Sequence, residues 1–158
     1  MLSQCEDLSQ STEGRYATDA ELDFFLEYVE SYPKRLSLYQ KLQTVESDIV
    51  ETVHQRIMAD HPHLLKNNKR DITVKWKRDT VRTLRVSAVA ILLDDPTTLQ
   101  ERYLLWFQSV MGAFKAQKSC DITYSIMQEV VHHFLEPDES SLLIPILELN
   151  RTALGMNT

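Results

Sequence analysis

Apolar side chains recur at every third or fourth position along almost the whole chain, and this period limits the possible folds more than any other feature. Such spacing puts apolar residues on one face of an α-helix, whereas a half-buried strand needs alternation, which no segment shows. The 158 residues include only three glycines. We therefore predict one all-α domain of six to eight packed helices, because a chain of this length can bury a sizeable core.

Capping residues and prolines predict where these helices begin and end. Thr18 and Glu21 form a capping-box pattern, so a helix is expected to start at Thr18. Pro33 is expected to interrupt or restart this helix, because proline removes a backbone hydrogen bond from a helix interior. Further helices are expected over 73–93, 97 to about 115, 119 to about 135 and 137–154, with an exposed connection over 60–71.

The composition argues against several classes of protein. No apolar run is long enough to span a bilayer, and the N-terminus lacks a signal-peptide pattern, so a cytoplasmic protein without membrane contact is predicted. Cys5 and Cys120 lack metal-ligand spacing, and the adjacent His132 and His133 point apart on a helix, so no metal site is predicted. Because phosphate-binding glycine loops and nucleophile elbows are also missing, the sequence predicts that the chain is not an enzyme.

A basic region stands out in a chain whose net charge is -6. Residues 66–85, which include Lys69, carry eight lysines and arginines against two aspartates. Four of them recur at three- and four-residue spacing and form what we call the basic stripe. Like charges at this spacing repel each other, so the positive charge of the stripe must be compensated. Acidic side chains of this protein or of a second subunit are one alternative, and the carboxylates of a bound anionic ligand are the other. Nucleic acid is not predicted, because the whole chain is acidic and the stripe has no interleaved aromatic platform. The stripe consists of Lys75, Arg78, Arg82 and Arg85.

Trp76 is the unusual residue of the 73–93 helix. The helical period predicts that Trp76 lies across the helix from the core-facing apolar residues, so it needs cover from another helix, a partner or a ligand site. These predicted core-facing residues are Val74, Val81, Leu84, Ala88, Ile91 and Leu92.

The residues 75–79, Lys-Trp-Lys-Arg-Asp, resemble the chromophore-site motif Lys-Cys-x-Arg-Asp of phycobiliprotein α-type subunits. The Gly-Arg-Tyr at 14–16 resembles the Gly-Arg-Phe or Gly-Arg-Tyr that begins the second helix of that family. The segments 79–93 and 149–154 are similar to the helix after the motif and to the end of the C-terminal helix. Since these similarities extend over essentially the whole chain, it is identified as a member of the phycobiliprotein superfamily.

The resemblance implies a globin-like phycobiliprotein fold of about eight helices in a single domain, 1–158. Residues 1–32 would form an N-terminal helical extension that docks a partner subunit, and 33–158 a globin-like body that holds a linear tetrapyrrole, or bilin. In the family the motif aspartate accepts hydrogen bonds from pyrrole N–H groups, while the arginine and lysine pair with the propionates. Carried over, these roles fall to Asp79, Arg78 and Lys75. The candidate non-covalent bilin pocket is therefore Lys75, Trp76, Arg78 and Asp79.

This chain departs from the motif at Trp76, which stands where the family has the cysteine that bonds the bilin. An indole cannot form a thioether, so no covalent bilin is expected. Cys120 belongs to a later helix and is not the usual attachment position. Either a bilin binds reversibly beside Trp76, or the indole fills the pocket and no pigment is held.

Phycobiliprotein relatives without the attachment cysteine resemble the bilin-biosynthesis-associated globins. This resemblance implies a non-enzymatic accessory protein of cyanobacterial bilin biosynthesis or phycobilisome metabolism. The alternatives are a reversible bilin carrier and a colourless structural subunit of an antenna assembly. Bilin-biosynthesis enzymes or phycobiliproteins are the implied partners. A homodimer is also predicted, because Phe24, Phe25, Leu26 and Tyr28 give the N-terminal segment more apolar surface than one short helix can bury.

Overall fold

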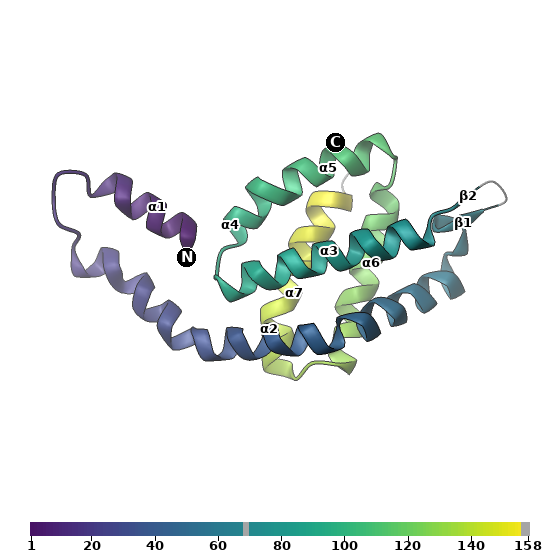
Figure 1. Ribbon diagram of the computed structural model, residues 1–158, viewed down its shortest axis with the longest axis horizontal. Coiled ribbons are helices and arrows are strands. Elements are labelled where there is room, and N and C mark those ends of the chain that lie inside the picture. Colours follow the sequence, from purple (N-terminus) through teal and green to yellow (C-terminus); the bar gives the residue numbers. More distant parts are fainter. Residues whose placement is uncertain (68–69, 156–158) are drawn as a thin grey trace.

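The computed structural model describes residues 1–67 and 70–155, and nearly all of its elements are helices (Figure 1). The α-helices are α1 Leu2–Ser11, α2 Asp19–Asp60, α3 Thr73–Leu92, α4 Pro96–Leu99, α5 Leu105–Ala113, α6 Gln117–Val130 and α7 Pro137–Gly155. The short elements are the 3₁₀ turns η1 Pro62–Leu64 and η3 Val131–His133, the π-helical turn η2 Gln100–Leu104, and the strands β1 Lys66–Asn67 and β2 Arg70–Asp71.

The helical class agrees with the sequence prediction, and the number of helices in the described residues lies within the six to eight predicted from the period, but below the number that the resemblance implied. The described residues form six α-helices of nine residues or more, with α4 a single turn, where about eight were expected. The predicted interruption at Pro33 is wrong, because α2 runs through it and joins the extension to the body. Contacts on both sides offset the hydrogen bond that proline removes. The Tyr28 hydroxyl donates to the Leu92 carbonyl at 3.0 Å, and Arg35 donates to the Ile91 carbonyl at 2.9 Å.

The connection between α2 and α3 contains a small hairpin that the sequence did not predict. Strands β1 and β2 pair antiparallel, with Lys66 opposite Asp71. The Ile72 amide then donates to the Leu65 carbonyl at 2.9 Å, which ties the end of the hairpin to its start. Strands of two residues are too short for alternation to appear in the sequence. Lys69, counted above in the basic region, lies outside the described residues.

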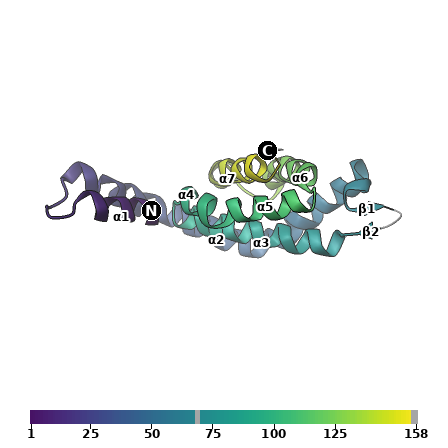
Figure 2. The ribbon, with the colours of Figure 1, turned by 90° about the horizontal axis from the view of Figure 1, so that it is seen from above.

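The core lies where two helical layers cross. Helices α2 and α3 lie side by side, and α6 and α7 pair with each other and cross them on one side (Figures 1 and 2). No helix in the described part of the chain combines the length and apolar character needed to cross a membrane. The fully buried side chains at this crossing include Ile49, Val53, Leu84, Met127, Val130, Leu143 and Leu147.

Residues 1–32, which we call the arm, project from the body (Figures 1 and 2). No residue of α1 is buried, and the first buried residue of α2 is Leu38. The arm touches the body near Asp95, whose carboxylate accepts from the Ser3 amide at 2.8 Å and from the Thr98 amide at 3.0 Å. Burial alone would raise the pKa of Asp95, but these hydrogen bonds outweigh it and lower the pKa to about 2.

Candidate ligand-binding cavity

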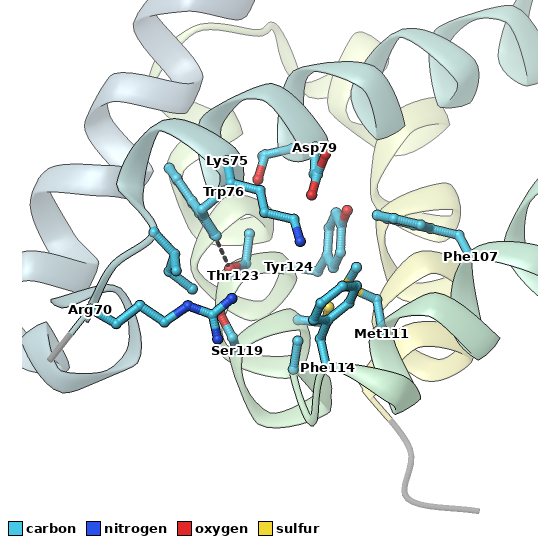
Figure 3. Close-up of a pocket in the computed structure, with 14 residues that line it drawn as sticks. Arg70, Lys75, Trp76, Asp79, Phe107, Met111, Phe114, Ser119, Thr123 and Tyr124 are labelled. Atoms are coloured by element: carbon cyan, nitrogen blue, oxygen red, sulfur yellow. Dashed lines mark hydrogen bonds between the residues drawn. The ribbon is translucent and has the colours of Figure 1, made fainter. Parts of the chain in front are cut away.

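A cavity lies beside the first half of α3, walled by α5 and α6 and bordered by the β2 strand (Figure 3). Its empty volume is about 630 Å³, with the space at its open mouth included. Apolar and aromatic side chains line it together with a few charged and polar groups, a composition typical of small-molecule sites. The cavity is therefore the candidate ligand site.

Helix α3 supplies several of the polar residues of the wall. Lys75, Trp76, Asp79 and Thr80 all line the cavity, because positions one, four and five residues apart fall on the same side of a helix. Arg78 does not line it. Its side chain is 73% exposed, since position 78 points to a different side of α3. Three of the four predicted site residues are thus brought together, and the motif arginine is turned away.

Trp76 is part of the buried wall of the cavity, so the prediction that it lies opposite the core is wrong. It is only 8% exposed, and its indole N–H donates to the Thr123 hydroxyl on α6 at 2.9 Å. On its other side, the ring centroid of His54 on α2 lies 5.8 Å away. Val74, expected in the core, is instead 85% exposed. The hydrogen bond and the two neighbouring helices fix the indole in place.

Helices α5 and α6 provide the residues that the motif did not reveal. Phe107, Met111 and Phe114 are spaced by four and three residues and line the cavity from the α5 side. Tyr124 lines it from α6, and burial raises the pKa of its hydroxyl. The helical spacing of the three α5 residues was visible in the sequence. Nothing in the sequence indicated that they face Trp76, because their helices are separated along the chain.

The two charged side chains that α3 contributes to the cavity, Asp79 and Lys75, have different neighbours. The Asp79 side chain is 24% exposed, and its contact with Arg78 Nε is 3.5 Å long, at the limit for a hydrogen bond. Its carboxylate is thus available to accept from a ligand. The ammonium of Lys75 lies 3.7 Å from the ring centroid of Phe114, a cation–π contact at the mouth.

Two further residues of the basic stripe have partners within the chain. Arg85 donates to the Glu46 carboxylate from Nε at 3.0 Å. Arg82 lies over the Trp106 ring, 5.5 Å from its centroid. An acidic side chain of the same protein therefore neutralises part of the positive charge. This is one of the two alternatives that the sequence left open. Among the described residues, no group of three or more histidine, cysteine, aspartate or glutamate side chains is placed to hold a metal ion.

Cys120 lines the cavity, yet it is a poor nucleophile. Burial, together with the negative charge of Asp79, raises the pKa of its thiol to about 12. Only the thiolate attacks electrophiles, and very little of it exists near pH 8. The side chain is also only 9% exposed, whereas Cys5 is half-buried.

This difference predicts the pattern of thiol alkylation. With iodoacetamide at pH 8, we expect the folded protein to gain one adduct, at Cys5, and the urea-unfolded protein to gain two. Intact-mass spectrometry followed by peptide mapping measures both states. Equal labelling rates of Cys5 and Cys120 in the folded protein would contradict the buried, protonated state of Cys120.

The family of the chain follows from its sequence as a whole. The model of the family described as phycobilisome protein matches residues 8–154. The chain belongs to the phycobilisome protein family. This match spans most of the arm and the entire cavity, and it confirms the membership of the phycobiliprotein superfamily that the 75–79 motif indicated. No curated protein matches the chain.

Proposed function

We propose that this phycobilisome-family protein binds a bilin reversibly in the cavity beside Trp76, forms no covalent bond with it and catalyses no reaction. One observation carries the proposal: the indole is held in the cavity wall by its hydrogen bond to Thr123, so it lines the open cavity without filling it. A pigment that can leave suits a cytoplasmic accessory of bilin biosynthesis or phycobilisome metabolism. Such a protein would hold a bilin and hand it on.

The chemistry of the cavity supports a bilin as the ligand. Asp79 offers a carboxylate that accepts hydrogen bonds from pyrrole N–H groups. Lys75 offers a cation for a propionate, and Phe107 and Met111 offer apolar surface for the flat pyrrole rings. A bound bilin supplies absorption of visible light. The protein residues would fix its conformation and exclude water from one side of it.

Two features favour reversible over covalent binding. Trp76 has no thiol, and the Cys120 thiol stays protonated because burial raises its pKa to about 12. A thioether needs a thiolate, so neither residue supplies the required nucleophile. We therefore expect affinity to come from hydrogen bonds, ion pairs and apolar contact alone.

Titration with biliverdin tests the proposal. We expect a saturable, red-shifted and sharpened absorption band with one biliverdin bound per chain. The variant Ser119→Trp, which places a large ring at the cavity, should abolish the band. The matched control Ser109→Trp adds the same ring at an exposed position of α5 and should leave the band unchanged. A free-biliverdin spectrum at all concentrations of the wild-type protein would overturn the proposal.

We also propose that residues 1–158 form one domain and that the arm docks a second copy of the chain. Leu22, Leu26 and Val29 share one face of α2 and are 38%, 66% and 66% exposed. Residues 1–30 carry eight acidic side chains and one basic one. The exposed face of α3, with Arg78 and Arg82, has the opposite charge. Charge complementarity thus favours contact between the arm of one copy and α3 of the other.

The dimer can be tested by disrupting this apolar face. We expect light scattering coupled to size-exclusion chromatography to give twice the chain mass for the wild type. The double variant Leu26→Ser and Val29→Ser should be monomeric, because it removes two of the most exposed apolar side chains of the arm. The control Leu105→Ser changes a leucine on α5 that is 54% exposed and should remain dimeric. A monomeric wild type would contradict self-association and leave phycobiliproteins or bilin-biosynthesis enzymes as the proposed partners of the arm.

A further inference from the structure

The cavity has two cationic side chains near its mouth, and only one of them belongs to the 75–79 motif. Lys75 comes from α3, and Arg70 comes from β2. Figure 3 shows the Arg70 guanidinium reaching toward Ser119, with Asp79 on the far side of the cavity. In this view the Arg70 charge lies at one side of the cavity and the Asp79 acceptor at the other, with the Lys75 ammonium between them.

The motif arginine occupies a different surface. Arg78 lies in a shallow groove with Val81 and Arg82, on the outer side of α3. On a helix, position 78 is turned by about 60° from position 75 in the direction away from 76 and 79. Since 76 and 79 face the cavity, Arg78 cannot enter it unless the helix rotates. Among the residues that the structure describes, the one carboxylate within 4.0 Å of it is that of Asp79, at 3.5 Å.

The backbone of the hairpin explains why Arg70 can take this place. Strand β2 is held by its pairing with β1 and by the hydrogen bond from the Ile72 amide to the Leu65 carbonyl. Two residues after Arg70, Ile72 itself lines the cavity. Within the described part of the chain, Arg70 forms no ion pair, whereas Lys66 pairs with Asp71. A guanidinium held here is available for an incoming anion.

We infer that Arg70, together with Lys75, binds the carboxylates of a ligand in this cavity, and that Arg78 does not. The inference rests on the proposed function and names the residues that anchor the propionates of the bilin. A planar guanidinium binds a carboxylate through two parallel hydrogen bonds, which an ammonium cannot do. Arg70 thus adds orientation, and Lys75 adds charge.

The test compares Arg70→Ala with Arg78→Ala, and biliverdin with its dimethyl ester. The ester keeps the pyrroles but carries no carboxylate charge. By absorption titration, Arg70→Ala should weaken biliverdin binding at least about fivefold, because it removes a charge-assisted hydrogen bond. The same variant should bind the ester as the wild type does. Arg78→Ala, the matched control, should change neither affinity by more than about twofold. Circular dichroism checks that both variants are folded.

The outcomes separate this inference from the proposed function. If Arg78→Ala weakens biliverdin binding as much as Arg70→Ala does, the bilin proposal stands and the assignment to Arg70 is overturned. If Arg70→Ala weakens the ester equally, Arg70 acts through packing and the assignment is again overturned. Wild-type protein that binds neither compound would overturn both.

Discussion

Replacing Asp79 with asparagine is expected to weaken biliverdin binding by about ten- to a hundredfold. The carboxylate is the acidic group among the residues that line the cavity, and its partner Arg78 is at 3.5 Å. Asparagine keeps the size of the side chain but loses the negative charge that strengthens a hydrogen bond from a pyrrole N–H. The absorption band of bound biliverdin should also shift, because the hydrogen bonds to the pyrroles change. Absorption titration measures both effects.

Asp48→Asn is the matched control for this substitution. Asp48 is exposed on α2 and lies outside the cavity, so the same loss of charge should leave biliverdin affinity within about twofold of the wild type. Equal affinities of the Asp79→Asn variant and the wild type would show that this carboxylate does not contact the ligand.

Replacing Trp76 with alanine is expected to lower the free energy of unfolding by about 3–5 kcal/mol. The substitution removes a ring that is 8% exposed and packs between α2 and α6. It also leaves the hydroxyl of Thr123, a residue only 2% exposed, without the indole donor. Urea denaturation followed by circular dichroism gives this free energy without depending on tryptophan fluorescence.

Trp106→Ala is the control, since it truncates the same residue type at a position that is 52% exposed. We expect it to cost about 1 kcal/mol or less, because a half-exposed ring loses little burial. Similar losses for the two variants would contradict the structural role assigned to Trp76.

The boundaries of the elements were largely predictable because local chemistry sets them. The capping box at Thr18 and Glu21 begins α2 as expected, with Thr18 accepting from the Glu21 amide and the Glu21 carboxylate accepting from the Thr18 amide. Proline also marks the starts of α4 and α7. The break predicted at Pro33 failed, since tertiary contacts from Tyr28 and Arg35 to the end of α3 hold the helix on both sides.

The orientation of α3 could not be predicted from its apolar residues. Its buried face includes small polar side chains that a hydrophobic pattern does not count. Thr83 hydrogen-bonds to the Tyr103 hydroxyl at 2.7 Å, and Ser87 accepts from the Asn150 amide at 2.8 Å. These partners are distant in the sequence, so only the folded chain reveals why Thr83 and Ser87 can be buried. The predicted face was rotated as a result, and Trp76 was assigned to the wrong side.

The candidate site was predictable in part. The 75–79 motif located Lys75, Trp76 and Asp79, which do line one cavity. It could not reveal that Arg78 faces outward, because a motif gives the order of residues and not the rotation of the helix. The sequence placed Arg70 only within a basic region, and nothing in the sequence indicated that the hairpin brings Arg70 to the cavity.

A crystal structure of the protein grown with biliverdin tests the central claim most directly. The account predicts tetrapyrrole density in the cavity between Trp76 and Tyr124, with pyrrole nitrogens near Asp79 and no bond to Cys120. Trp76 should keep its hydrogen bond to Thr123. An empty cavity with Trp76 turned into it, or density joined to the Cys120 sulfur, would contradict the account.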